Sequence, residues 1–262
     1  MNKKITVIGA GNMGQSLIRG WLSSGFKKNN IFFIDSDPTV VISLNNQGIE
    51  SKDLFDFRDI DIIVIAVKPQ ALDSLLVDLS LNSLEDTVLI SVVAGKKIKT
   101  YQDVLGNLPI IRAMPNTPAT IGKGVTALCA SDEVNEEQKV LSQKLLESVG
   151  SVIWFEEAMI DIVTAISGSG PAYVFYFIEC LIGSAVQAGM KEDLARELAI
   201  MTVYGSANYA LESEQNLQEL RKRVTSPGGT TEAALEVLTN GDFKDCINLA
   251  INQAKKRSEE LN

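Results

Sequence analysis

The fold follows from one stretch near the N-terminus, Lys4-Ile5-Thr6-Val7-Ile8-Gly9-Ala10-Gly11-Asn12-Met13-Gly14. Its apolar beginning predicts a strand, and three glycines in the pattern G-x-G-x-x-G follow directly. The apolar residues that come next share one face of a predicted helix: Leu17, Ile18, Trp21 and Leu22. Strand, glycine turn and helix in this order predict a dinucleotide site, because the turn and the helix start can hold a pyrophosphate. The alternative is a chance turn of the same composition.

The first half of the chain repeats this alternation of strand and helix. Apolar runs predict further strands at residues 31–34, 61–67, 88–93, 110–114, 125–129 and 152–155. The run at 61–67 is apolar almost throughout, as expected for a strand buried on both faces of a parallel sheet. This rhythm predicts an α/β fold in which residues 1–157 form a Rossmann domain with a doubly wound sheet.

The strand signals stop after about residue 156. Apolar periodicity predicts helices at residues 158–166, 173–186, 193–211, 217–224, 230–239 and 243–261. We therefore expect residues 158–262 to form an all-helical domain. The helix at 173–186 is apolar almost all round, so it must be buried within its domain or against another subunit. Because the domain is small for such a helix, we expect a homodimer formed through it.

Each glycine of the first motif has its own task in a dinucleotide site. Gly9 allows the tight turn, Gly11 lets the backbone approach the pyrophosphate, and Gly14 permits close packing of helix on strand. Asp35 closes the second strand, where a carboxylate accepts hydrogen bonds from ribose hydroxyls and repels a 2′-phosphate. Asp35 therefore favours NADH over NADPH, and its alternative role is that of a turn or cap residue.

Further candidate cofactor residues lie at the ends of predicted strands, where ligands sit in open α/β sheets. Lys68 is a candidate catalytic acid as well as a structural or ribose-binding residue, and Asn116 is equally explained by a simple turn. The residues predicted to bind the cofactor are Ile8, Gly9, Ala10, Gly11, Asn12, Met13, Gly14, Asp35, Ser36, Ala66, Val67, Lys68, Pro69, Val93, Ala94 and Asn116.

A second glycine turn, Ser226-Pro227-Gly228-Gly229-Thr230-Thr231, lies between two predicted helices. Its glycines let successive N–H groups point at one spot, and the next helix adds the positive end of its dipole. Such a turn can hold a small anion such as a carboxylate, with the Thr231 hydroxyl beside it. A helix–helix turn with a threonine cap is the plainer interpretation.

The composition of the 262 residues excludes several kinds of function. The formal net charge is −9 and no basic stripe is present, so nucleic acid is not an expected partner. The chain contains no histidine, which excludes a histidine triad, metal site or acid–base catalyst. The three cysteines have no paired spacing, so we expect no metal site. The first apolar run is too short for a signal peptide or a membrane span, and we expect a cytoplasmic protein.

Five motifs, in this order, resemble those of pyrroline-5-carboxylate reductase, the last enzyme of proline biosynthesis. They are VIGAGNMG (7–14), AVKP (66–69), RAMPNTP (112–118), SGSGPAY (167–173) and VTSPGGTT (224–231). The last two are the specific ones, because other Rossmann enzymes share the first. The resemblance implies a Rossmann domain followed by a helical domain that interlocks with a partner, and some members assemble dimers into larger rings.

The resemblance also implies the reaction: a hydride passes from NAD(P)H to the C=N carbon of 1-pyrroline-5-carboxylate and gives L-proline. The active site would lie between the Rossmann cleft of one subunit and the helical domain of the dimer, with Thr231 as the catalytic residue. Carried over by motif, the substrate-binding residues would be Glu214, Val224, Ser226, Gly229, Thr230 and Thr231. Two positions depart from the family pattern: Arg223 replaces a frequent asparagine, and Asp35 shifts the common use of NADPH toward NADH.

Two other functions stay open on the sequence alone. A reductase of a different imine or of a hydroxy acid would share the fold. Hydroxy-acid enzymes of this kind typically need a catalytic lysine where this chain has Ser167, Ser169 and Tyr173. A non-catalytic nucleotide sensor acting in transcription would need a basic DNA-binding module, and none is visible in the sequence.

Overall fold

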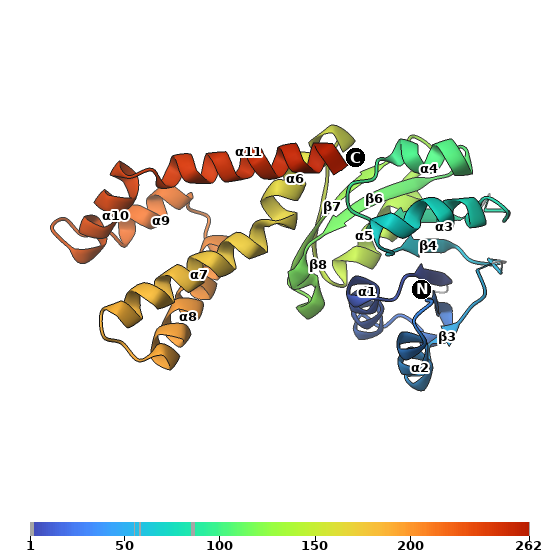
Figure 1. Ribbon diagram of the computed structural model, residues 1–262, viewed down its shortest axis with the longest axis horizontal. Coiled ribbons are helices and arrows are strands. Elements are labelled where there is room, and N and C mark those ends of the chain that lie inside the picture. The colour runs from blue at the N-terminus through green and yellow to red at the C-terminus, as the bar shows by residue number, and fades with distance from the viewer. Residues whose placement is uncertain (1–2, 55, 58, 85–86, 262) are drawn as a thin grey trace. The chain divides into compact units, whose positions relative to one another are not determined.

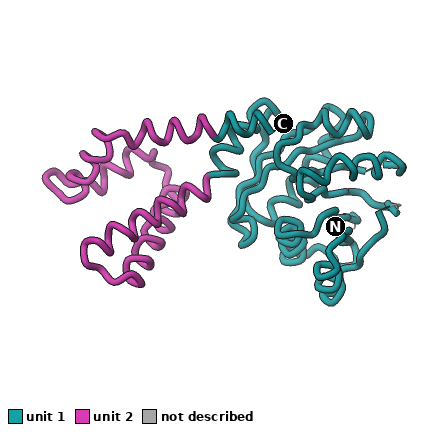
Figure 2. The backbone as a smooth tube through the Cα atoms, viewed as in Figure 1, with its two compact units in different colours: residues 1–169, 254–262 teal, residues 170–253 magenta. Residues whose placement is uncertain are grey.

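The protein folds into two compact units. The computed structural model describes residues 3–54, 56–57, 59–84 and 87–261. Unit 1 comprises Met1–Ser169 and Ala254–Asn262, and unit 2 comprises Gly170–Gln253 (Figure 2). The domain boundary expected between residues 157 and 158 rests on the change from strand signals to helix signals in the sequence, and it stays a prediction.

Unit 1 is built on a mixed sheet, part of whose strands are labelled in Figure 1. Among the described residues the sheet has eight strands, in the order β3-β2-β1-β4-β5-β6-β7-β8. The strands are β1 (Ile5–Ile8), β2 (Ile31–Ile34), β3 (Glu50–Ser51), β4 (Ile62–Ile65), β5 (Val88–Ser91), β6 (Ile110–Pro115), β7 (Gly124–Ala130) and β8 (Gly150–Trp154). Of the described pairs, only β6 and β7 run antiparallel. The predicted Rossmann-type α/β fold is confirmed, whereas β3 and the antiparallel pair were not predicted.

The core of unit 1 lies on both faces of this sheet. Ile62 and Val64 of β4 belong to one buried apolar cluster, and Ile63 and Ile65 belong to another. This alternation explains why the strand is apolar throughout. The helices of unit 1 are α1 (Asn12–Ser23), α2 (Pro38–Asn46), α3 (Leu72–Leu79), α4 (Ile98–Leu105), α5 (Glu136–Glu147) and α6 (Ile160–Val163). Short helical turns are η1 (Lys28–Asn30), η2 (Pro69–Ala71), η3 (Thr117–Ile121), η4 (Glu157–Met159) and the π-helical η5 (Thr164–Gly168).

The described residues of unit 2 contain helices joined by turns and no strand. Unit 2 contains α7 (Gly170–Gln187), α8 (Glu192–Glu212), α9 (Leu217–Arg223), α10 (Thr230–Asn240) and most of α11 (Phe243–Leu261), whose last residues belong to unit 1. Its buried apolar residues, within the described chain, are Ala195, Ala199 and Leu220. Phe175 and Tyr176 of α7 are 58% and 68% exposed. A single chain therefore leaves the apolar surface of α7 uncovered.

One helical stretch of the described residues, Glu157–Gln187, is long and apolar enough to cross a membrane. This criterion uses length and composition alone, and a helix that packs against another subunit meets it equally well. Only 6% of the apolar segment is buried in the single chain.

Candidate functional site

The first glycine motif forms a turn at the carboxyl end of β1. Gly9 has a φ of +89°, and a Cβ at this position would lie 2.8 Å from the backbone carbon and oxygen of Ala66. The turn therefore lies directly against the end of β4, where no side chain fits. Gly14 is confined in the same way, since a Cβ there would meet the carbonyl oxygen of Gly9 and lie 3.2 Å from Cγ1 of Val7. These contacts are the tight turn and the close helix–strand packing that the motif predicts.

Gly11, in contrast, borders open space. It is the exposed N-cap residue of α1, and a Cβ there would have no heavy atom within 4 Å. The first N–H groups of a helix have no partner within the helix, and they attract anions. Space beside a glycine at a helix start thus suits the pyrophosphate of a dinucleotide. Within the same motif Ala10 is buried, Asn12 is exposed and Met13 is half-buried.

Asp35 lies at the end of β2 and is held against this motif. Its Oδ2 accepts the N–H of Ala10 at 2.7 Å, and its Oδ1 accepts the N–H of Asp37 at 2.8 Å. Asp37, rather than Asp35, caps α2, because its Oδ1 accepts both the hydroxyl of Thr39 at 2.7 Å and the N–H at 2.8 Å. These bonds hold the pKa of Asp37 below its ordinary value. Asp35 thus acts as a turn residue, the alternative role given in the sequence analysis, and its contact with the ribose stays a prediction.

The other predicted cofactor loops follow neighbouring strands of the sheet. Ala66 donates its N–H to Ile8 at 2.8 Å, so the pairing of β1 with β4 continues into the loop. Val67 is half-buried, whereas Lys68 and Pro69 are exposed at the start of η2. After β5, Val93 is buried and Ala94 is exposed, and Ser36, in the loop after β2, is exposed too. The structure thus brings the predicted cofactor residues at 8–14, 35–36, 66–69 and 93–94 to one edge of the sheet, since β2, β1, β4 and β5 are parallel neighbours.

Asn116 follows β6 and is buried, with both ends of its amide bonded to the backbone. Oδ1 accepts the N–H of Val125 at 3.0 Å, and Nδ2 donates to the carbonyl of Ser167 at 3.0 Å. The side chain therefore ties the end of β6 to β7 and to the SGSGPAY motif. These bonds give Asn116 a structural role, and its contact with the cofactor stays a prediction.

Sequence reasoning missed a buried polar network beneath the β5 loop. Arg112 of β6 has a side chain only 4% exposed, and its Nη1 lies 3.2 Å from Oε1 of Glu157. The hydroxyls of Tyr101 and Ser91 form a short hydrogen bond in the same region. Burial raises the pKa of Tyr101 to about 12. An arginine inside an apolar strand run is the sequence signal that points to such a network.

The second glycine turn precedes α10 in unit 2. Gly228 has a φ of +72° and donates its N–H to Oε2 of Glu232 at 2.7 Å, while Gly229 donates to the carbonyl of Ser226 at 2.9 Å. Two amides of the turn thus shape the turn itself. Thr230 and Thr231 are the first two residues of α10, and at a helix start the N–H groups have no acceptor within the helix. The substrate contact predicted for the Gly229 amide stays a prediction.

The remaining candidate substrate residues lie before this turn. Val224 is 62% exposed and caps the end of α9, and Ser226 is exposed within the turn itself. Thr231 is half-buried and Thr230 is exposed. Glu214 is exposed between α8 and α9, outside the turn. The structure therefore groups Val224, Ser226, Thr230 and Thr231 in one segment, whereas the role of Glu214 stays a prediction.

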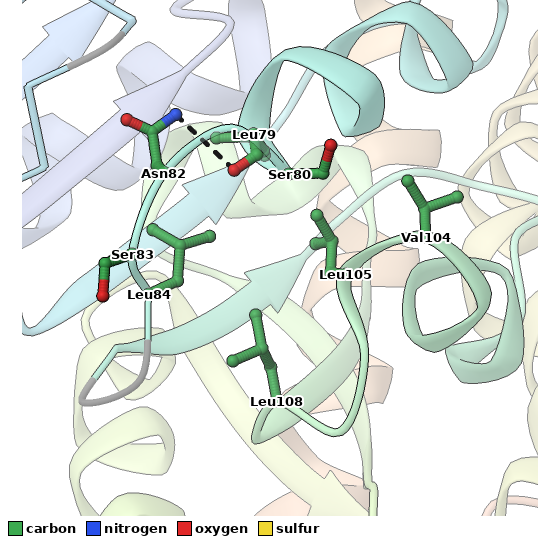
Figure 3. A pocket seen from close by; sticks show the side chains of 8 residues that line it. All are labelled: Leu79, Ser80, Asn82, Ser83, Leu84, Val104, Leu105 and Leu108. Carbon is green, nitrogen blue, oxygen red and sulfur yellow. Dashed lines mark hydrogen bonds between the residues drawn. The ribbon is translucent and has the colours of Figure 1, made fainter.

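Two other observations bear on where the site lies. A hollow of about 180 Å³ is lined by residues at the ends of α3 and α4, among them Leu79 and Leu105, and by residues of the segments that follow these helices (Figure 3). Its residues Leu84 and Leu108 precede β5 and β6, so it lies at the amino edge of the sheet and not at the candidate site.

Among the described residues, no group of three or more cysteine, aspartate and glutamate side chains is placed to hold a metal ion.

Comparison with known proteins decides the family. A family model for pyrroline-5-carboxylate reductase dimerisation matches residues 157–261, and one for coenzyme F420-dependent NADP oxidoreductase matches residues 4–95. Pyrroline-5-carboxylate reductase 2 of Bacillus subtilis is 38% identical over 99% of this chain and 95% of its own length. The chain belongs to the pyrroline-5-carboxylate reductase family. The resemblance that the five motifs carry is thereby confirmed.

Other members of the pyrroline-5-carboxylate reductase family agree in sequence and fold. The Pseudomonas aeruginosa enzyme is 37% identical over 98% of this chain and 96% of its own length. A solved pyrroline-5-carboxylate reductase from Coxiella burnetii is 35% identical with a TM-score of 0.96, and the match covers 100% of this chain and 99% of that one. The Plasmodium falciparum enzyme, solved with NADP bound, is 32% identical with a TM-score of 0.87 over 99% of this chain and 98% of its own.

Proposed function

We propose that this chain is an NAD(P)H-dependent reductase that converts 1-pyrroline-5-carboxylate to L-proline by hydride transfer to the C=N carbon. The observation that carries the proposal is the match to reductases of that name over 98–99% of the chain. The dimerisation family model matches residues 157–261, a range that contains both specific motifs, residues 167–173 and 224–231. The cytoplasmic location expected from the sequence is part of the same proposal.

The chemistry suits a chain without histidine. When bound, the nicotinamide supplies the hydride, and a protonated imine is already electrophilic. The protein has to hold the substrate carboxylate, orient the ring and exclude water. Backbone amides can stabilise an anion without a side chain that titrates near neutral pH.

We assign the substrate carboxylate to the N–H groups of Thr230 and Thr231 at the start of α10. The Thr231 hydroxyl then orients the ring nitrogen and moves its proton. Support comes from the bond between Gly228 and Glu232 at 2.7 Å, which fixes the turn while leaving these two amides at the free end of the helix. A turn that is fixed before the substrate arrives costs less ordering on binding.

We assign the cofactor to the glycine motif and propose a preference for NADH within a family that also uses NADP. Support comes from Asp35, whose carboxylate is held at the motif by the N–H of Ala10. The adenosine ribose of a dinucleotide binds at this point of such folds. The hydroxyl of Thr39 is bonded to Asp37, which leaves the exposed Ser36, the residue after Asp35, as a hydroxyl for a 2′-phosphate.

The full-chain protein with 1-pyrroline-5-carboxylate and either NADH or NADPH tests these assignments. We expect cofactor oxidation and proline formation, with the higher kcat/KM for NADH. Thr231→Ala should lower turnover by about one to three orders of magnitude with NADH affinity nearly unchanged. Thr239→Ala, at the other end of α10, is the control, since its hydroxyl donates to Leu235 at 2.7 Å. Unchanged kinetics in Thr231→Ala would remove the hydroxyl from the mechanism.

We also propose that the chain functions as a homodimer through unit 2, and that larger rings of dimers form from it. Support comes from an apolar groove of about 930 Å³ within unit 2, lined by α7, α8, α10 and α11. Phe177 lies in this groove, whereas Leu211 lies outside it and is 84% exposed. Light scattering should show Phe177→Glu as a monomer and the control Leu211→Glu as wild type. A wild-type protein that is monomeric at micromolar concentration would contradict the dimer.

A further inference from the structure

The loop between β5 and α4, residues 92–97, is held from below by buried groups. Val92 donates its N–H to Ile65 at 2.9 Å, and Val93 donates to Oγ of Ser91 at 3.2 Å. Ser91 is fully buried and its hydroxyl is bonded to that of Tyr101. The beginning of the 92–97 loop is therefore fixed by α4 and by β4 together.

The far end of the 92–97 loop is capped from another element. The N-cap residue of α4, Lys97, makes no side-chain cap. Instead, Oε1 of Glu157 accepts the N–H of Ile98 at 2.8 Å, and the same oxygen is bonded to Arg112. A carboxylate at a helix start satisfies free N–H groups and complements the helix dipole. The start of α4 is thus fixed to the buried Arg112.

The middle of the 92–97 loop touches the end of α11. Gly95 has a φ of +68°, and a Cβ there would lie 2.9 Å from the carbonyl oxygen and 3.0 Å from Cβ of Leu261. We call residues 254–261 of α11 the α11 tail. Both the α11 tail and the 92–97 loop belong to unit 1.

The α11 tail is itself seated on unit 1. Ser258 is the buried residue of α11, and its hydroxyl donates to Oδ1 of Asp161 in α6 at 2.7 Å. The neighbouring charges form ion pairs among themselves on the exposed side, Lys255 with Glu259 and Arg257 with Glu260. Ser258 is therefore the polar anchor of a segment whose next turn reaches Gly95.

We propose that the α11 tail is a positioning element for the cofactor loop, and that it acts through Gly95. Val93 and Ala94, which are predicted to contact the cofactor, immediately precede this contact. The inference rests on the proposed function for the identity of the ligand and for its contact with Val93 and Ala94. A displaced α11 tail removes the backing of Gly95, so the 92–97 loop opens and the cofactor binds less tightly.

Two glycine variants separate this contact from simple backbone strain. Gly95→Ala pushes against Leu261, whereas Gly122→Ala has nearly the same φ, +69°, and nothing within 4 Å of its Cβ. Fluorescence titration should give Gly95→Ala a Kd for NADH raised about tenfold, and Gly122→Ala a Kd within about twofold of wild type. Equal Kd values for the two variants would overturn the proposal.

Ser258 variants test the α11 tail without touching the loop. In the protein without cofactor, Ser258→Ala should speed hydrogen exchange of amides 92–98 severalfold at unchanged global stability. Ser258→Thr keeps the hydroxyl and should restore wild-type exchange. If amides 92–98 exchange at the same rate in Ser258→Ala as in the wild type, the inference is overturned. A wild type that binds NADH without reducing 1-pyrroline-5-carboxylate would refute the proposed function alone, because exchange and Kd still report on the loop.

Discussion

Asp35→Ser separates two roles of one carboxylate, that of holding the glycine motif and that of choosing the cofactor. Asp35 accepts N–H groups from Ala10 and Asp37 at 2.7 and 2.8 Å. Hydrogen bonds to a charged group contribute about 1.5–3 kcal/mol each, toward the lower end at a half-buried site. Because serine can still accept one of the two, we expect a loss of about 1–2 kcal/mol in unfolding free energy without cofactor.

The same substitution should raise the preference for NADPH. Two unit charges 4 Å apart repel by about 1 kcal/mol in water and about 4 kcal/mol at an effective dielectric constant of 20. Removing the carboxylate relieves this repulsion for a 2′-phosphate and also removes an acceptor for the ribose hydroxyls of NADH. We therefore expect the ratio of kcat/KM for NADPH to that for NADH to rise about tenfold or more, since tenfold corresponds to about 1.4 kcal/mol.

Asp37→Ser is the matched control for Asp35→Ser. It removes the same charge two residues away, and serine is a good N-cap for α2. Urea unfolding without cofactor and initial rates with both cofactors are measured on the wild type and the two variants. A cofactor ratio that moves equally in both variants, or in neither, would refute the ribose assignment and leave Asp35 only its structural role.

Three further substitutions test the supporting geometry. Gly14→Ala should lower unfolding free energy by about 1–3 kcal/mol in urea titrations, because its Cβ meets the Gly9 carbonyl. Gly11→Ala should keep wild-type stability and weaken cofactor binding, since its Cβ enters the open space; normal cofactor affinity would contradict this placement of the pyrophosphate. In the folded protein the pKa of Tyr101 is raised to about 12. Its protonated hydroxyl therefore contributes fully to the unfolding free energy below about pH 10, and this contribution is lost as pH rises toward 12. Between about pH 9 and 11 the unfolding free energy of Tyr101→Phe should therefore fall less than that of the wild type. If the unfolding free energies of the two proteins fall in parallel with pH, the raised pKa of Tyr101 is refuted.

Local sequence signals predicted the elements well where apolar periodicity and an end signal coincide. The strand at 31–34 and the helix at 243–261 were predicted with the bounds that β2 and α11 have. The helix at 230–239 was one residue short of α10, which ends at Asn240 before Gly241. Each of these elements is recognised from residues within a few positions of its own ends, so one sequence suffices.

The contacts that support the candidate site could not be predicted in the same way. Ser258 and Asp161 are 97 positions apart, and nothing in either neighbourhood of the sequence points to the other. The direction of β7 relative to β6 has no apolar signature, because both strands are buried runs. The residue type at Asp35 suggested its chemistry, whereas its partner at Ala10 depends on where the first turn lies in space.

Unit 1 and unit 2 differ in how much apolar surface they bury, and this difference affects cofactor binding and substrate binding differently. Unit 1 has apolar clusters on both faces of its sheet, so the glycine motif and Asp35 rest on a core of their own. α10, which begins with Thr230 and Thr231, has no buried residue in the described chain, and Leu238 is 45% exposed in the apolar groove. The turn before α10 is thus fixed locally by Glu232, whereas the helix behind it lacks a cover within one chain. Under the proposed dimer the second copy supplies that cover, so substrate recognition depends on assembly in a way that cofactor recognition does not.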